Sequence, residues 1–238
     1  MSEAAYTDVL NDGISRVSLL SHSGGDESVV RAARISHGKT VTDPERDKKL
    51  IAYMLLHHHG TPFEHNLFTF RIKAPIFVFR QWHRTRIGVS FNEVSARYTE
   101  MKDEFYIPKV WRMQDTKNKQ GSVGFEVFDH DSFSRGLEAE CARSMHVYKE
   151  MIRVGIAREM ARMVLPVNLY SDMWFSCNAR SLMNFIELRS EDHAQAETRL
   201  YSDALAECLK QCMPWTYEAF ASRLDPDKYR GLKLAEVA

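Results

Sequence analysis

The sequence lacks an excess of charge of either sign. Its 238 residues include 32 Lys and Arg and 32 Asp and Glu, so the formal net charge at pH 7 is zero. A chain without overall positive charge has no long-range field that attracts nucleic acid or an anionic membrane. Any recognition of an anion must therefore depend on a local cluster of basic residues.

Long apolar runs are also missing. No run approaches the roughly 18 residues of a membrane span, and the N-terminal segment MSEAAYTDVLNDGISRV has no basic stretch followed by an apolar one. We therefore expect a non-secreted, cytoplasmic protein. The length is below the ~250–300 residues at which hydrophobic cores stop growing, and we expect one domain over residues 1–238.

Cysteine is scarce. The four cysteines, Cys141, Cys177, Cys208 and Cys212, form no C-x-x-C pair, which argues against a zinc ribbon and a redox dithiol. Cys208 and Cys212 lie four residues apart in a helical pattern, where buried free thiols are expected. This pattern fits a reducing compartment.

The usual nucleotide-binding and nucleophile motifs are absent. There is no G-x-x-x-x-G-K-[ST] and no G-x-G-x-x-G, so a glycine-rich loop does not hold the phosphates of a nucleotide. There is also no G-x-S-x-G to activate a serine. Arginine side chains must bind any phosphate instead.

What the sequence contains is a mixture of helical and strand patterns. Asp43 at an N-cap position and Pro44 after it begin a helix that Gly60 would end; its apolar face is Leu50, Ile51, Met54 and Leu55. Strands are predicted over residues 14–22, 65–75 and 167–176, and helices over residues 75–84, 131–155, 157–166, 178–190 and 193–215. Residues 112–124 are polar and predict a loop. Because the strands do not alternate regularly with helices, we expect a helix-rich α+β domain around a small, mainly antiparallel sheet.

Basic residues gather in the stretch RQWHRTRIGVSFNEVSARY, residues 80–98. Apolar residues such as Trp82 and Ile87 interleave with the charges, which indicates partial burial. Buried arginines need anionic partners, and Glu93 alone cannot neutralise the arginines of this stretch. A phosphate-bearing ligand would supply the missing charge through bidentate contacts.

A second group of arginines is ambiguous. Arg158 and Arg162 are four residues apart and share a face of a predicted helix, whereas Arg180 and Arg189 lie on nearly opposite sides of another. These arginines either bind an anion or form surface ion pairs with Glu159, Glu187 and Glu191. From this group alone, surface ion pairs are the simpler interpretation.

The histidine-rich segment HHHGTPFEH, residues 57–65, suggests a metal-dependent hydrolase. Three adjacent histidines point about 100° apart on a helix, however, and His65 has no partner four residues away on the same element. We expect no metal site. Histidines near a helix C-terminus, where the dipole favours them, are the simpler interpretation.

Residues 90–98, SFNEVSARY, resemble the signature S-x-N-E-x-S-x-R-Y of the flavin-dependent thymidylate synthases. Further blocks typical of that family follow in order between Val30 and Phe220: VRAARIS, ERDKKLIAYMLLHHHGTPFEH, KAPIFVFRQW, REMARMVLPVNLY, NARSLMNFIELR and PWTYEAF. Two features differ from the family pattern. Arg84-Thr85-Arg86 replaces Arg-His-Arg, and the spacer before Ser90 has three residues instead of two.

The resemblance implies a homotetramer whose shared active sites methylate dUMP to dTMP. The one-carbon unit would come from methylenetetrahydrofolate and the hydride from FAD, which NADPH reduces, with no enzyme nucleophile. No membrane and no specific nucleic-acid partner is expected. A non-catalytic nucleotide- or RNA-binding member of the same fold is the alternative, because Thr85 replaces the family histidine.

The resemblance also implies the site residues. For dUMP they are Gln81, Arg84, Glu93, Val94, Ser95, Ala96, Arg97, Arg162 and Arg189. For FAD they are Ser36, Thr61, Arg84, Thr85, Arg86, Glu93, Asn178, Arg180 and Asn184. Arg189 is the implied catalytic residue, since a permanent cation can stabilise negative charge on the uracil but cannot act as a base.

Overall fold

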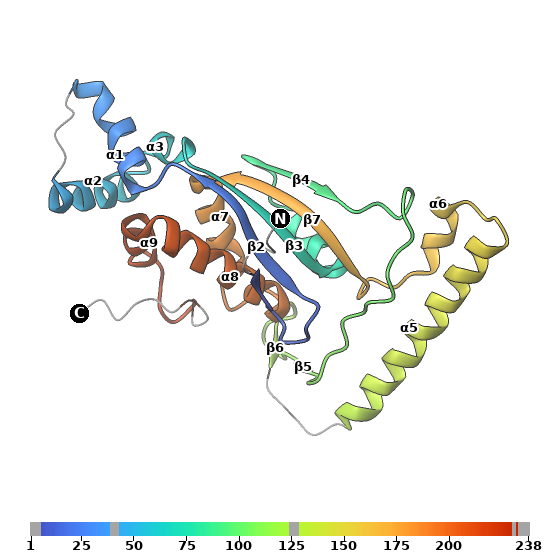
Figure 1. Ribbon diagram of the computed structural model, residues 1–238. Coiled ribbons are helices and arrows are strands. Elements are labelled where there is room, and N and C mark those ends of the chain that lie inside the picture. Colours follow the sequence, from blue (N-terminus) through green and yellow to red (C-terminus); the bar gives the residue numbers. More distant parts are fainter. Residues whose placement is uncertain (1–5, 39–42, 124–128, 230–231, 233–238) are drawn as a thin grey trace. The chain divides into compact units, whose positions relative to one another are not determined.

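The computed structural model describes residues 6–38, 43–123, 129–229 and 232 (Figure 1). By their contacts, the residues divide into two compact units. Unit 1 comprises Met1–Ile72, Thr85–Phe91 and Trp174–Ala238, and unit 2 comprises Lys73–Arg84 and Asn92–Met173. One domain over residues 1–238 stays a prediction.

The main sheet has five strands in the order β1-β2-β3-β7-β4, and β1 pairs antiparallel with β2. The strands are β1 (Tyr6–Thr7), β2 (Arg16–Ser23), β3 (Leu67–Pro75), β4 (Val89–Glu93) and β7 (Tyr170–Asn178). The three predicted strands correspond to β2, β3 and β7, whereas β4, which carries the start of the signature, was not predicted. Helices around a small sheet confirm the α+β class.

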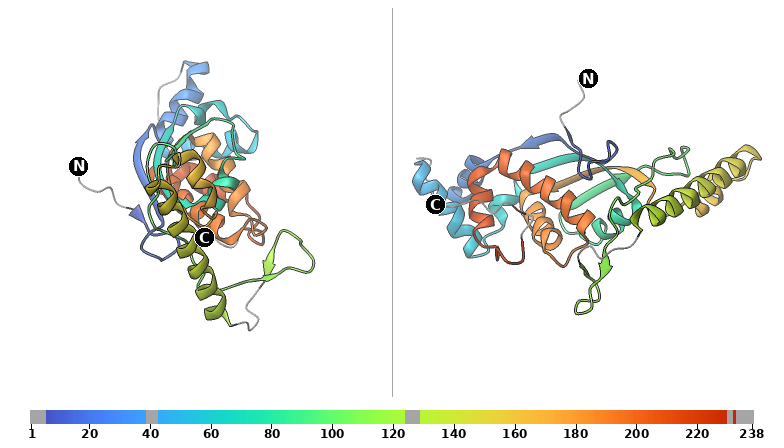
Figure 2. Two further views of the ribbon diagram at one scale, coloured as in Figure 1. Left: turned by 90° about the vertical axis from the view of Figure 1, so that its right-hand side faces the viewer. Right: turned by 90° about the horizontal axis from the view of Figure 1, so that it is seen from below.

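Unit 1 buries an aromatic core beneath its helices. Alternation along β3 places Phe68 and Phe70 fully inside, where the ring of Phe70 stacks on Phe175 with centroids 6.2 Å apart. Its helices are α1 (Asp26–Arg34), η1 (Ile35–His37), α2 (Pro44–Leu56), α3 (Thr61–Glu64), α7 (Ala179–Ser190), α8 (Ala196–Cys212) and α9 (Pro214–Ala221). Helix α8 packs on α7 and β2, and α9 packs on α2 (Figures 1 and 2). Each buried Phe contributes about 1.5–3 kcal/mol through the hydrophobic effect.

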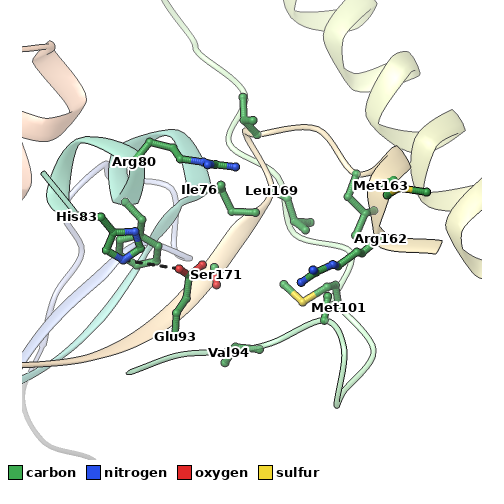
Figure 3. Close-up of a pocket in the computed structure, with 14 residues that line it drawn as sticks. Ile76, Arg80, His83, Glu93, Val94, Met101, Arg162, Met163, Leu169 and Ser171 are labelled. Carbon is green, nitrogen blue, oxygen red and sulfur yellow. Dashed lines mark ion pairs between the residues drawn. The ribbon is translucent and has the colours of Figure 1, made fainter. Parts of the chain in front are cut away.

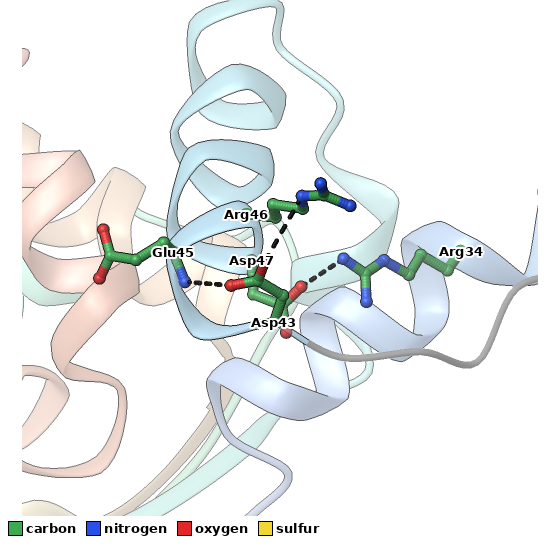
Figure 4. Close-up of polar contacts among 5 residues, drawn as sticks. All are labelled: Arg34, Asp43, Glu45, Arg46 and Asp47. Atoms are coloured by element: carbon green, nitrogen blue, oxygen red, sulfur yellow. Dashed lines mark hydrogen bonds and ion pairs between the residues drawn. The ribbon is translucent and has the colours of Figure 1, made fainter.

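Helix α2 begins as the sequence predicts and ends earlier. The Asp43 carboxylate caps it by accepting a hydrogen bond from the Glu45 N–H at 3.1 Å (Figure 4). The predicted end at Gly60 was wrong, because the helix ends at Leu56. His58 adopts a left-handed conformation with φ 58° and redirects the chain, and Gly60 instead precedes α3.

A buried ion pair ties α2 to α1. The Arg34 guanidinium contacts the carboxylate of Asp47, which is 3% exposed (Figure 4). Removing one partner of such a pair leaves an uncompensated buried charge, which is strongly destabilising. The pair therefore fixes the two helices that flank one of the cavities described below.

Unit 2 is built on a long helix. Its helices are α4 (Ile76–Trp82), α5 (His130–Arg153), α6 (Arg158–Ala161) and η2 (Arg162–Val164). Met145 and Tyr148 of α5 pack with Ala161 and Leu169 in a buried cluster. The helix predicted over residues 157–166 breaks into α6 and η2, so Arg158 and Arg162 do not share one α-helical face as expected.

The polar segment predicted as a loop contains a short hairpin. An antiparallel hairpin of β5 (Met113–Gln114) and β6 (Ser122–Val123) forms within it. Gly124 lies outside the described residues. No helix in the described ranges is long and apolar enough to cross a membrane.

Candidate functional site

A cavity of about 520 Å³ opens in unit 2. It is lined by Ile76, Phe79, Arg80, His83, Glu93, Val94, Ala96, Met101, Arg162, Met163, Leu165, Val167, Leu169 and Ser171. We call it the arginine pocket (Figure 3). Its walls come from α4, from the end of β4 and the segment that follows it, and from the chain that runs from η2 to the start of β7.

Two cations face the arginine pocket from different elements. Arg80 projects from α4 and Arg162 from η2 (Figure 3). Among the described residues, neither guanidinium forms an ion pair with a carboxylate, and Glu93 is the one carboxylate in the lining. Two arginines against one carboxylate leave the pocket positively charged when His83 is neutral. Such a pocket suits an anionic ligand with oxygen atoms that accept bidentate hydrogen bonds.

His83 and Glu93 face each other in this pocket. His83 Nε2 lies 3.8 Å from Glu93 Oε2, within ion-pair distance if the imidazole is protonated. The imidazole stacks on the ring of Phe79, with centroids 6.3 Å apart. The Val94 N–H donates to the Asp172 carbonyl at 2.9 Å, which joins the end of β4 to β7.

The pocket brings together four residues predicted for dUMP, namely Glu93, Val94, Ala96 and Arg162. Ser95 and Arg97 are adjacent in sequence but do not line it. Ser95 instead begins a turn in which its Oγ accepts a hydrogen bond from the Arg97 N–H at 3.3 Å. Arg97 Nε lies 3.5 Å from Glu159 Oε2 in an exposed ion pair.

The remaining residues predicted for dUMP lie elsewhere. Gln81 is half-buried on α4, and Arg84 is exposed just after that helix. Arg189 is half-buried near the end of α7, which belongs to unit 1. None of the three lines the arginine pocket.

Sequence reasoning missed Arg80, His83, Met101 and Ser171 as pocket residues. Arg80 and His83 lie in the basic stretch and had a signal in their charge, whereas Ser171 lies in a strand pattern with no such signal.

Unit 1 contains two further cavities, which share Met54 and His59 in their linings. The smaller, of about 240 Å³, includes Arg180 and Asn184, and we call it the Arg180 cavity. The larger, of about 670 Å³, includes Ser36 and Thr61, and we call it the Ser36 cavity. Four residues predicted for FAD therefore line these two cavities.

Arg180 is held in place by the protein itself. Its Nη1 lies 2.5 Å from Glu64 Oε1. Its guanidinium also lies against Gly60, where an added Cβ would be 2.5 Å from Arg180 Nε. The lack of a side chain at Gly60 therefore makes room for the arginine.

Asn178 and the longer spacer meet at the start of α7. Asn178 caps this helix, since its Oδ1 accepts a hydrogen bond from the Ser181 N–H at 2.9 Å. Gly88, in the spacer, has φ 67° and packs so closely that an added Cβ would lie 2.2 Å from Ser181 Oγ. The spacer therefore contacts the helix that carries Arg180 and Asn184.

Thr85 and Arg86, also predicted for FAD, line none of these cavities. Thr85 is 6% exposed, and its Oγ1 has no hydrogen-bond partner within the part of the chain that the structure describes. Arg86 is exposed.

The unit 1 cavities offer groups that suit FAD. The ring of Tyr53 lies 4.2 Å from His57 and 6.2 Å from His59, so planar side chains gather beside the shared lining. Aromatic faces stack favourably with another planar ring. Arg180 and Asn184 provide donors for phosphate and carbonyl oxygen atoms. The residues present therefore fit this cofactor.

The histidine-rich segment does not form a metal-ligand cluster. Over the described ranges, no group of three or more His, Cys, Asp or Glu side chains is arranged to hold a metal ion. His57 and His59 instead lie beside Tyr53.

The cysteines are free and lie outside these cavities. Cys208 and Cys212 are free thiols as predicted, and both are half-buried instead of buried. Burial raises the pKa of Cys208 to about 12 and raises the pKa of Cys177 further. Thiols with raised pKa values are weak nucleophiles at neutral pH, because the thiolate is the reactive form.

Known proteins resemble this chain over nearly its whole length. The family described as "Thymidylate synthase complementing protein" matches residues 18–215. The flavin-dependent thymidylate synthase of Thermosipho africanus is 49% identical over 215 residues, which cover 89% of this chain and 92% of that protein. A flavin-dependent thymidylate synthase of Thermus thermophilus is 41% identical over 218 residues, which cover 91% of this chain and 78% of that protein.

A solved structure is also similar to this chain. The UMP/dUMP methylase PolB from Streptomyces cacaoi, bound with 5-Br dUMP, has a TM-score of 0.80 and 34% sequence identity; the match covers 92% of this chain and 96% of that one. The signature at residues 90–98, the positively charged pocket and the similarity over most of the chain all indicate the same family. The chain belongs to the family of flavin-dependent thymidylate synthases.

Proposed function

We propose that this protein methylates C5 of dUMP to give dTMP, with FAD as its redox cofactor. The reaction consumes dUMP, methylenetetrahydrofolate, NADPH and a proton, and yields dTMP, tetrahydrofolate and NADP⁺. The arginine pocket is the observation on which this proposal mainly rests. In this chain, which belongs to the family, the pocket is lined by two arginines and one carboxylate.

Arg162 is the residue that we assign to the phosphate of dUMP. It faces the pocket without an internal carboxylate partner among the described residues, so a dianionic phosphate can accept its N–H groups. Glu93 has the opposite role. Its carboxylate accepts hydrogen bonds, and it therefore selects a hydroxyl or N–H group of the nucleotide.

Ser36, Thr61, Arg180 and Asn184 are the residues that we assign to FAD. When bound, FAD supplies the hydride that reduces the transferred one-carbon unit, and NADPH replenishes it. Arg180 forms an exposed ion pair with Glu64, which gives its guanidinium a preferred orientation before a ligand binds.

Arg189 is assigned to the uracil ring. A guanidinium cannot act as a base, but it stabilises the enolate-like charge that makes C5 nucleophilic. No cysteine lies in the cavities, and burial raises the pKa of Cys177 and Cys208, which supports a reaction without an enzyme nucleophile. Ser95 is assigned as a hydrogen-bond donor to dUMP.

The assembly that we propose is a homotetramer with shared active sites. The residues assigned to dUMP lie in both units and those assigned to FAD line two cavities, and sharing of sites among chains would accommodate this distribution. Sedimentation of the purified protein measures the assembly directly, and a monomer at assay concentration would contradict this part of the proposal.

A second candidate substrate is UMP. The PolB methylase was solved with both 5-Br dUMP and 5-Br UMP, at 34% and 35% identity to this chain. Assays with dUMP and with UMP under the same conditions separate the two specificities. Our proposal expects a preference for dUMP.

The decisive assay uses the purified protein with NADPH, methylenetetrahydrofolate and dUMP labelled with tritium at C5. We expect a yellow protein with a flavin absorption band, release of tritium and formation of dTMP. A colourless protein that cannot bind added FAD contradicts the proposal. Binding of dUMP without substrate-dependent oxidation of reduced flavin would instead favour a non-catalytic nucleotide-binding protein.

A further inference from the structure

The arginine pocket contains a buried hydroxyl group whose role is not yet explained. Ser171, on β7, is 4% exposed, and its Oγ has no hydrogen-bond partner among the residues that the structure describes. Buried hydroxyl groups nearly always have a partner, and one left without it costs free energy. Ser171 lines the cavity, so a group inside the cavity can supply that partner.

Strand pairing places Ser171 close to Glu93. The Val94 N–H donates to the carbonyl of Asp172, the residue after Ser171, at 2.9 Å. Figure 3 shows Ser171 beside the Glu93 carboxylate. A serine hydroxyl group can donate a hydrogen bond to a carboxylate.

His83 approaches the same carboxylate from α4. Its Nε2 lies 3.8 Å from Glu93 Oε2, which is longer than a hydrogen bond but short enough to form one after a small adjustment (Figure 3). Stacking on Phe79 restricts the imidazole plane. Thr85, two residues after His83, is buried and does not line the cavity, whereas His83 does.

We propose that His83 and Ser171 are positioning residues that orient the Glu93 carboxylate to accept a hydrogen bond from the bound pyrimidine nucleotide. This inference rests on the proposed function, because it names residues that serve its nucleotide site. Two neighbours on different elements restrict the carboxylate to one orientation. Their contribution lies in nucleotide affinity, since they act on Glu93 and not on the reacting atoms.

The test compares three variants of the full-length protein loaded with FAD. His83→Phe keeps a ring against Phe79 but removes the nitrogen atoms, His83→Gln keeps a donor, and Ser171→Ala removes the hydroxyl group. We measure the Kd for dUMP by equilibrium dialysis, and kcat and KM for dUMP. His146→Phe and Ser144→Ala, on α5 and outside the pocket, are the matched controls.

We expect His83→Phe and Ser171→Ala each to raise the Kd and KM for dUMP on the order of tenfold, with kcat changed less than about twofold. His83→Gln recovers part of the lost affinity, and both controls match the wild type. In a Glu93→Gln background, His83→Phe changes the Kd by less than about twofold, because the carboxylate that it orients is gone.

Three results would overturn the inference: a Kd unchanged in both His83→Phe and Ser171→Ala, an equal loss of affinity for His83→Phe in the Glu93→Gln background, or a loss confined to kcat. If His83→Phe does not fold, as judged by its FAD content and unfolding temperature, Ser171→Ala alone and with Glu93→Gln decides the question.

The dialysis also separates this inference from the proposed function. If the wild type binds dUMP but does not methylate it, the proposed function fails, and the Kd ratios still decide the role of His83 and Ser171. If the wild type methylates dUMP and the Kd values do not change, only the positioning inference fails. A wild type that does not bind dUMP contradicts both.

Discussion

The arginines of the arginine pocket in unit 2 and Arg180 in unit 1 differ in whether a carboxylate pairs with the guanidinium. Within the described residues, Arg80 and Arg162 face the arginine pocket without a carboxylate partner. In the Arg180 cavity of unit 1, Arg180 already pairs with Glu64 at 2.5 Å, and Arg223 shares the lining with Glu187. An arginine without an internal partner provides net charge for an anionic ligand, whereas a paired arginine provides fixed donors with little net charge.

Both regions also contain methionine, aliphatic and planar side chains in their linings. Aliphatic side chains and thioethers, such as Met101, Met163 and Leu165, fill the gaps in the arginine pocket. The Ser36 cavity of unit 1 has Tyr53 and His59 in its lining, with ring centroids 6.2 Å apart. Net positive charge suits the phosphate of a nucleotide, and planar side chains suit a planar cofactor.

We expect the largest effect from Arg189→Ala, which tests whether each unit binds only one of the two ligands. Arg189 lies on α7 in unit 1, yet we assign it to the uracil of dUMP. We expect Arg189→Ala to lower kcat on the order of 10²–10³-fold, the usual effect of removing one electrostatic stabiliser, while the FAD content stays the same. Single-turnover kinetics and the flavin spectrum measure both. Unchanged turnover would refute the assignment, and Arg143→Ala on α5 is the control.

We expect the second largest effects from two variants, each of which should weaken the binding of a different ligand. Arg162→Ala removes a cation without an internal partner, and we expect the KM for dUMP to rise on the order of 10- to 100-fold with unchanged FAD affinity. Arg180→Ala should lower FAD affinity about tenfold and leave dUMP binding unchanged. Equilibrium binding of each ligand to both variants provides the test. If either variant weakens both ligands equally, the two regions do not have separate roles.

A glycine substitution tests the close packing of Gly88 against α7 in unit 1 through the free energy of unfolding. In Gly88→Ala the new Cβ would meet Ser181 Oγ at 2.2 Å, and φ 67° strains the new residue. We expect about 1–3 kcal/mol lower free energy of unfolding, with weaker FAD binding because α7 shifts. Thermal or urea unfolding measures it. Gly136→Ala, where the Cβ meets nothing within 4 Å, should be neutral or stabilising by up to about 1 kcal/mol. Equal effects of the two substitutions would contradict the close packing at Gly88.

The smallest effect concerns the thiols, which neither region uses. Burial raises the pKa of Cys208 to about 12, so the thiolate fraction at pH 8 is far below that of an ordinary cysteine. We expect Cys208→Ala to keep activity within about twofold, and iodoacetamide at pH 8 to inactivate the wild type slowly. Rapid inactivation that Cys208→Ala prevents would show a functional thiol.

The sequence predicted those parts of the molecule that local patterns determine. Asp43 caps α2 as expected, and the strand predicted over residues 65–75 forms as β3, with Phe68 and Phe70 buried. The end of α2 was missed, because the left-handed conformation of His58 is uncommon for a residue other than glycine. No local signal marks it.

The candidate site was partly predictable for the same reason. Glu93 and Arg162 belong to recognisable family blocks and do meet in one pocket. Ser171 reaches that pocket only because the end of β4 pairs with β7, a contact between segments far apart in the sequence. Pairing of this kind depends on the whole sheet and cannot be read from the composition of either strand.

The most direct test of the central claim is a crystal structure of the protein with FAD and 5-bromo-dUMP, in which the anomalous signal of bromine locates the pyrimidine. We expect bromine in the arginine pocket, the phosphate in contact with Arg162, and the flavin in contact with Arg180 and Asn184. A nucleotide bound elsewhere, with Arg162 making no contact to it, would refute the assignment of the arginine pocket to dUMP.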